Sequence, residues 1–179
     1  MARWNKVDVP HKGWKYIGIE DLGEDVYPGE EIRYEQCEMC GNEKIRYVHI
    51  LTHPDFDGEL RVGCDCASNL TNDYVNPREH ERNYRNRTNR RTNFLRQEWT
   101  RKPETGNYTL RYRGERITIM KSKFGSGWGV MFHNESRWEY NGRKIRDLEI
   151  AKLVAFEMFD ELHEFCGVGA GNVNCEIFV

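Results

Sequence analysis

Two close cysteine pairs constrain this chain more than any other feature. They lie at the ends of the stretch CEMCGNEKIRYVHILTHPDFDGELRVGCDC, residues 37–66. Cys37 and Cys40 have the Cys-x-x-Cys spacing of a metal-binding turn, whereas Cys64 and Cys66 are separated by one residue instead of the usual two. Four thiols this close together are seldom core residues. Because zinc takes about four such ligands in a tetrahedron, the stretch predicts a bound Zn2+ ion.

The expected ligands are the four cysteines Cys37, Cys40, Cys64 and Cys66. If one thiol of the second pair does not bind, His49 or His53 is the obvious substitute, since imidazole is the other common zinc ligand. A redox or disulfide pair and a buried cysteine core are the alternatives for the thiols. For each histidine, an ordinary hydrogen-bonded role is the alternative.

The residues around the cysteines favour strands. Residues 14–19 form one strand candidate, and β-branched and aromatic residues dominate residues 44–51 and recur in GELRVGC after the turn residues HPDFDG. These two segments predict a hairpin between the cysteine pairs. The second pair would then follow a strand and precede a helix.

A basic helix is expected next. NPREHERNYRNRTNRRTNFLRQEWTRK, residues 76–102, has no glycine, opens with a proline suited to a first turn and stops before Pro103. Residues 77–102 carry nine Lys and Arg against three Asp and Glu, whereas the segments 1–36, 37–76 and 145–179 are all acidic. Such a block predicts a polyanion-binding face. Its expected contacts with nucleic acid are Arg78, Arg82, Arg85, Arg87, Arg90, Arg91 and Arg96.

Two other interpretations of this helix remain open. A helix so poor in apolar residues could be a solvated bridge between two modules, or it could bind a protein partner. Basic side chains also occur on the expected strands that follow, among them Arg111 and Arg116, and Trp128 lies near a glycine-flanked turn that could expose it.

The C-terminal part predicts a second module. Residues 107–140 alternate as strands do, and residues 146–165 place apolar side chains on one face of a helix. A three- or four-stranded antiparallel sheet with a helix across it is expected. The predicted fold class is therefore α+β, with a zinc module and N-terminal strand in residues 1–76, a basic linking helix in 77–102, and the sheet and helix in 103–179.

The order of knuckle, hairpin and ligands at a helix start resembles a treble-clef zinc finger. More narrowly, CEMCG, YVHI and LRVGCDCA resemble the zinc-bound form of the HNH endonuclease motif. This resemblance implies zinc ligation by the four cysteines and aligns His49 with one histidine of the motif. Val48 and Ala67 stand where two further histidines are expected, so the catalysis of that family, a histidine base and a divalent metal at the phosphate, is not expected here.

Two broader resemblances concern the rest of the chain. The segments GCDCASNLTNDYVNPREHE and DLEIAKLVAFEMFDEL are similar to a family of uncharacterised bacterial and phage proteins. This similarity does not indicate which activity the chain has. The second module resembles in outline the small three-strand-and-helix DNA-binding domains that accompany HNH nucleases in some phages.

Composition favours a cytoplasmic protein with no membrane segment. The chain is 38% hydrophobic and 31% charged, it has no apolar run of about 18 residues, and MARWNKVDVPHKGW lacks the apolar core of a signal peptide. The sequence thus predicts a zinc-stabilised, non-catalytic nucleic-acid-binding protein. The alternatives are an HNH-like metal-dependent nuclease with His49 as base, and a phage or host regulatory module that binds another protein.

Overall fold

The chain forms two compact units. The computed structural model describes residues 9–24, 26 and 30–164, so residues 165–179 of the predicted C-terminal module lie outside the described residues. The units comprise residues 1–89 and 90–179, and the division between them falls within the long helix α2 (Asn76–Leu95). The predicted linking helix therefore contributes residues to both units.

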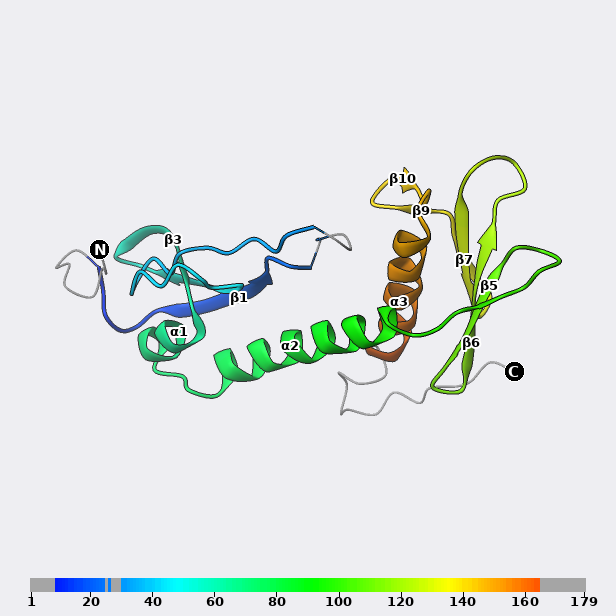
Figure 1. The fold of residues 1–179 in the computed structure, drawn as a ribbon. Coiled ribbons are helices and arrows are strands. Elements are labelled where there is room, and N and C mark those ends of the chain that lie inside the picture. The colour runs from blue at the N-terminus through cyan, green and yellow to red at the C-terminus, as the bar shows by residue number, and fades with distance from the viewer. Residues whose placement is uncertain (1–8, 25, 27–29, 165–179) are drawn as a thin grey trace. The chain divides into compact units, whose positions relative to one another are not determined.

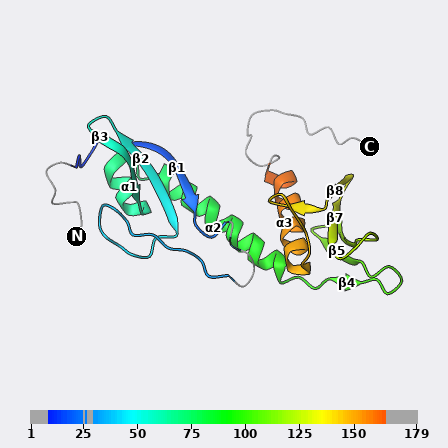
Figure 2. The same ribbon diagram turned by 90° about the horizontal axis from the view of Figure 1, so that it is seen from above.

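The first unit is built on a three-stranded antiparallel sheet. Its strands β1 (Lys15–Asp21), β2 (Tyr47–His53) and β3 (Phe56–Val62) lie in the order β1-β2-β3, and β2 and β3 form the predicted hairpin. The short helix α1 (Cys64–Thr71) follows β3 at once and lies against the sheet (Figure 2). Apolar side chains from the sheet, α1 and the first cysteine loop form one buried core.

The helical segment differs from the prediction at both ends. A separate helix, α1, precedes it, and the chain turns between the two helices at Asn72, whose φ of 55° is in the left-handed region. α2 ends at Leu95 instead of residue 102, because Thr100–Arg101 form strand β4, which pairs with the next strand. Periodicity alone did not distinguish the last helical turn from this edge strand.

The second unit is a five-stranded antiparallel sheet covered by one helix. Its strands run in sequence order from β4 to β8, one strand more than the largest sheet predicted. They are β4, β5 (Tyr108–Tyr112), β6 (Glu115–Lys121), β7 (Trp128–Phe132) and β8 (Glu135–Arg137). Helix α3 (Leu148–Glu164) packs on β6 and β7 (Figure 1), and β9 (Glu139–Tyr140) and β10 (Arg143–Lys144) form a small separate ribbon.

The alternation of residues along β5, β6 and β7 explains how the second core forms. Leu110, Ile117 and Val130 are buried on the side of the sheet that faces α3. Phe94, near the end of α2, is fully buried in the same core, where its ring lies 5.6 Å from that of Phe156 in α3. The end of α2 is therefore part of the hydrophobic core of the second unit.

These elements make the protein a mixed α+β structure, as predicted, with three helices and several antiparallel sheets among the described residues. Within those residues, none of the helices has the length and apolar character needed to cross a membrane.

Candidate functional site

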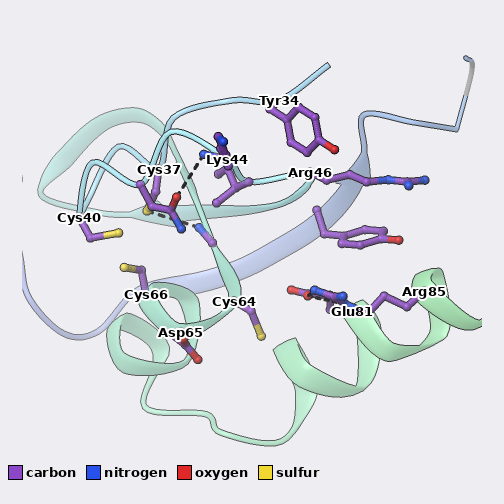
Figure 3. A pocket seen from close by; sticks show the side chains of 14 residues that line it. Tyr34, Cys37, Cys40, Lys44, Arg46, Cys64, Asp65, Cys66, Glu81 and Arg85 are labelled. Atoms are coloured by element: carbon purple, nitrogen blue, oxygen red, sulfur yellow. Dashed lines mark hydrogen bonds and ion pairs between the residues drawn. The ribbon is translucent and has the colours of Figure 1, made fainter. Parts of the chain in front are cut away.

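Three of the four predicted ligands come together in the first unit. The sulfur atoms of Cys37, Cys40 and Cys66 all lie within 4.8 Å of one another. Cys37 and Cys66 are buried and Cys40 is exposed, and Figure 3 shows the side chains of Cys40 and Cys66 pointing toward each other. These residues, hereafter the three-cysteine group, could hold a metal ion.

The loop that carries the first two cysteines is a tight, hydrogen-bonded turn. The Gly41 amide donates to the Cys37 carbonyl oxygen at 2.8 Å, and the Cys37 amide donates to the Asn42 carbonyl oxygen at 2.7 Å. Gly41 has a φ of 81°, which glycine adopts without strain. Met39 at the tip is fully buried in the core, so packing holds the loop in place.

The electrostatic surroundings favour a thiolate at Cys37. Hydrogen bonds from the Cys66 thiol and from backbone amides, among them the Gly63 N–H at 3.4 Å, lower the pKa of Cys37 well below its usual range. The same hydrogen bond, together with burial, raises the pKa of Cys66. Cys37 and Cys66 thus share one proton. A cation placed among the three sulfurs would displace it, because metal ligation requires deprotonated thiols.

Cys64, the fourth predicted ligand, lies elsewhere. α1 begins at Cys64, so Cys64 and Cys66 stand two positions apart on one helix and project from different sides of it. Figure 3 shows the Cys64 side chain turned away from Cys66 and toward α2. Because the helix begins at Cys64, the one-residue spacing places the two thiols on different sides of α1.

Cys64 belongs to a second group with His49 of β2 and Glu81 of α2. One ligand atom from each of these residues lies within 4.8 Å of the others. We call His49, Cys64 and Glu81 the mixed group. Sequence reasoning gave His49 two roles, a substitute ligand for the first site and the base of the nuclease alternative, and it missed Glu81. No spacing signal marked Glu81, because the turn between α1 and α2 is what returns the chain to His49.

Hydrogen bonds fix both ionisable partners of Cys64. His49 is fully buried; its Nδ1 lies 3.2 Å from the Tyr16 hydroxyl and its Nε2 lies 3.3 Å from Glu81 Oε2. The other carboxylate oxygen of Glu81, Oε1, accepts a hydrogen bond from Arg85 Nε at 2.8 Å. The pKa of Glu81 is lowered, since the hydrogen bonds from His49 and Arg85 outweigh the opposing effect of burial. Burial, reinforced by the negative charge of Glu81, raises the pKa of Cys64 to about 11.

A pocket of about 490 Å³ opens beside both groups (Figure 3). All three residues of the three-cysteine group line it, as do Cys64 and Glu81. Its remaining lining residues include the cationic side chains Lys44, Arg46 and Arg85 and the aromatic side chains Tyr34 and Tyr47. A small solute could therefore reach the three cysteines and, in the mixed group, Cys64 and Glu81.

His53, the other substitute ligand, belongs to neither group. It lies near the end of β2, where its Nδ1 accepts a hydrogen bond from the Asp55 amide at 3.0 Å. Its ring packs beside the buried Trp14, with 5.3 Å between ring centroids. The structure thus gives His53 the role of an ordinary packed and hydrogen-bonded histidine.

Most of the expected nucleic-acid contacts on α2 form ion pairs. Arg87 reaches Glu24 at 2.6 Å within the first unit, and Arg90 reaches Asp160 of α3 at 3.0 Å within the second. Arg78, Arg82 and Arg85 pair with carboxylates at or near the helix surface, namely Asp65, Glu79 and Glu81. Arg91 is half-buried and Arg96 is exposed. Part of the basic block therefore holds α2 in place.

The face of the five-stranded sheet that points away from α3 carries a different basic cluster. Arg111 on β5 and Arg116 on β6 are exposed partners directly across the strand pair. We define the open face as the outward positions of β4 to β8, which include no Asp or Glu: Thr100, Thr109, Arg111, Arg116, Thr118, Met120, Gly129, Met131 and Ser136.

The indole of Trp138 also lies over this face. A Cβ atom at Gly129 would meet its ring at 2.6 Å, and the side chain is 42% exposed. Trp128, the tryptophan that the sequence singled out, is half-buried instead and packs against Tyr108, with ring centroids 5.7 Å apart. Trp138, together with Phe124 in the loop before β7, is thus an exposed aromatic of this module.

Comparisons with known proteins complete the description of the site. A scan against protein-family models found no match, and searches of curated proteins and of solved structures found none either. The geometry of the described residues is therefore what indicates a function for this chain.

Proposed function

We propose that this protein is a zinc-stabilised nucleic-acid-binding protein that contacts phosphates through the open face of its five-stranded sheet. The observation that carries the proposal is the Arg111–Arg116 pair. Like charges directly opposite each other on a sheet destabilise it, and the outward strand positions supply no carboxylate to offset them. A polyanion would supply the missing counter-charge, and guanidinium groups bind phosphate oxygens in bidentate fashion.

An aromatic side chain supports this surface, and the part of α2 in the first unit carries a separate exposed arginine. Trp138 offers an exposed ring on the same face, where a base could stack. On α2, Arg82 is 67% exposed and its contact with Glu79 is long, at 3.5 Å, so it remains able to reach a phosphate. We assign the main contacts to the sheet and an auxiliary role to the exposed arginines of α2.

The metal proposed for the three-cysteine group is zinc, in a treble-clef-like setting of knuckle, hairpin and helix. Cys37 and Cys40 on the tight turn and Cys66 in the first turn of α1 supply three of the four ligands that a structural zinc site takes. Because all three residues line the pocket, water could fill the fourth position. Zinc there would hold the knuckle loop to α1.

The surroundings of His49 argue against nuclease chemistry. Both of its ring nitrogens have partners, Tyr16 and Glu81, and the side chain is fully buried. A general base must reach the attacking water, and this histidine does not reach solvent. We therefore expect no cleavage of plasmid DNA or structured RNA in magnesium or manganese. Cleavage that is lost in His49→Asn would replace this proposal by the nuclease alternative.

Fluorescence anisotropy with labelled duplex DNA, single-stranded DNA and RNA tests the binding surface. We expect the Arg111→Glu/Arg116→Glu variant to bind at least about tenfold more weakly at low salt. Because two phosphate contacts are lost, the slope of log affinity against log salt on duplex DNA should flatten by about 2.

The matched control is Arg143→Glu/Lys144→Glu. Both residues are exposed on the separate β9–β10 ribbon, and their replacement changes the net charge by the same amount. It should keep nearly the affinity of the unmodified protein. Equal losses in the two double variants would show that only net charge matters, and an absence of binding to all three ligands at low salt would favour a protein partner.

A further inference from the structure

We infer that the mixed group is a second metal site, separate from the three-cysteine group, which binds a divalent ion of the zinc type through His49, Cys64 and Glu81. One imidazole, one thiolate and one carboxylate are each established zinc ligands. Their ligand atoms already converge within 4.8 Å, although they come from three different elements, β2, α1 and α2. This inference does not depend on nucleic-acid binding.

The histidine is held in the orientation that a metal ligand needs. Without a metal, Nε2–H faces Glu81 Oε2; an ion that replaces this proton would lie between Nε2, Cys64 and Glu81, while Nδ1–H donates to the Tyr16 oxygen, 3.2 Å away. Metal-binding histidines usually have such a hydrogen-bond partner on the second ring nitrogen, which fixes the tautomer. His49 is fully buried, so this arrangement is built into the core of the unit.

The carboxylate is oriented in the same way. Arg85 binds Oε1 of Glu81 and leaves Oε2 directed at His49. The Arg85 guanidinium itself lies over the Tyr47 ring, 5.1 Å from its centroid, which limits its movement. The imidazole and the carboxylate therefore each have a second hydrogen-bond partner, Tyr16 and Arg85 respectively. Ligands of bound metals usually have such partners, whereas a simple ion pair does not need them.

A divalent ion would bind all three side chains at once, whereas the metal-free group is held by the contacts of Glu81 with His49 and Arg85. Cys64 and Glu81 line the pocket, so a fourth coordination position can be reached from solvent. The two groups therefore differ in their donor atoms, three sulfurs in one and nitrogen, sulfur and oxygen in the other.

Titration of metal-free protein with Co2+ tests the inference. We expect two ions per chain and two spectroscopic steps, because the sulfur-to-cobalt absorption grows with the number of bound thiolates. The ion at the three-cysteine group should give about three times the absorption of the ion at the mixed group. A single step that saturates at one ion per chain would overturn the inference.

Variants assign the second step. Cys64→Ser and Glu81→Gln should each lose the weaker-absorbing ion, or bind it at least about tenfold more weakly, and should keep the other. Glu79→Gln, an exposed neighbour on the same helix, is the control and should keep both ions. If Cys64→Ser also abolished the three-thiolate spectrum, Cys64 would be a ligand of the first site and the separate site would not exist.

Tyr16→Phe tests whether the Tyr16 hydroxyl orients His49 for metal binding, in a variant that should still fold. It removes only the hydroxyl that faces His49 Nδ1, and we expect it to weaken the second ion about 10- to 100-fold without affecting the first. Unchanged affinity for both ions in this variant and in Glu81→Gln would show that the three side chains form a hydrogen-bonded cluster and no metal site.

Discussion

At the scale of single residues, Asp21 holds the far end of β1 to the rest of the first unit. Its two oxygens accept hydrogen bonds from Arg46 at 2.6 and 2.9 Å, and further bonds come from the Gly23 amide and the Thr88 hydroxyl. The Asp21 side chain is 5% exposed and that of Arg46 is 18% exposed. Consistent with this pairing, the hydrogen bonds that Arg46 donates to Asp21 raise the pKa of Arg46.

Asp21→Asn should therefore destabilise the first unit. The substitution leaves the half-buried guanidinium of Arg46 without its anion and turns one acceptor into a donor, so we expect a loss of about 2–3 kcal/mol in the free energy of unfolding. Urea unfolding at constant metal concentration measures it. Asp57→Asn removes the same charge from an exposed position on β3 and should change stability by less than about 0.5 kcal/mol. Equal effects would contradict the role of this ion pair.

The sequence predicted some functional residues well and others poorly, for physical reasons. Cys37 and Cys40 are close in sequence, so their spacing alone indicates a shared ligand site. Glu81 joins His49 only through the turn at Asn72, and no local pattern encodes that return. Trp138 lies over the open face because its indole covers Gly129, and such a tertiary contact has no local sequence pattern.

At the scale of elements, α2 contributes charged side chains to the packing of both units. Arg90 has 32% of its side chain exposed, and its partner Asp160 on α3 has 5%. Arg82, eight positions earlier, has 67% exposed and a weak partner on its own helix. Two arginines of one basic run thus have different energetic roles.

Charge reversal distinguishes the two roles. Arg90→Glu places a carboxylate beside the buried Asp160, and we expect it to destabilise the second unit by about 2–4 kcal/mol. Arg82→Glu should change stability by no more than about 0.5 kcal/mol. Thermal or urea unfolding of the two variants gives the comparison, and a stable Arg90→Glu variant would show that the Asp160 contact is unimportant.

The elements themselves were predictable to different degrees. β-Branched and aromatic residues with turn residues between them marked the β2–β3 hairpin, and alternation of apolar side chains marked the strands β5 to β7, because one face of each of these is buried. α1 and β4 were missed. α1 has only eight residues and begins within the Cys-x-Cys spacing, and β4 has two, so neither is long enough to establish a period.

At the scale of the whole molecule, the two hydrophobic cores should depend differently on the proposed metal. The first contains Cys37 and Cys66 beside Met39, whereas the core residues that the structure describes in the second unit include no cysteine. The free energy of metal binding would therefore stabilise the first core.

Chelation should accordingly separate two unfolding transitions. We expect a strong chelator to lower the melting temperature of the first unit by more than about 10 °C and to leave that of the second nearly unchanged. Calorimetry measures both transitions. Near-ultraviolet circular dichroism can follow the first through the buried Trp14, by comparison with Trp14→Phe. A single transition that moves as a whole would show that the units unfold together.

One turn of α1 supplies a thiol to each group of ligands, and the two groups differ in chemical softness. Three sulfurs favour thiophilic ions such as copper(I) or cadmium, whereas nitrogen, sulfur and oxygen together favour borderline ions such as zinc and cobalt. When cadmium and cobalt are added together, cadmium should therefore occupy the three-cysteine group and cobalt the mixed group. Absorption spectra would reveal this distribution, and cobalt at the three sulfurs would contradict it. Cys66 and Cys64, which are two positions apart in the chain, would then bind metal ions of different chemical softness.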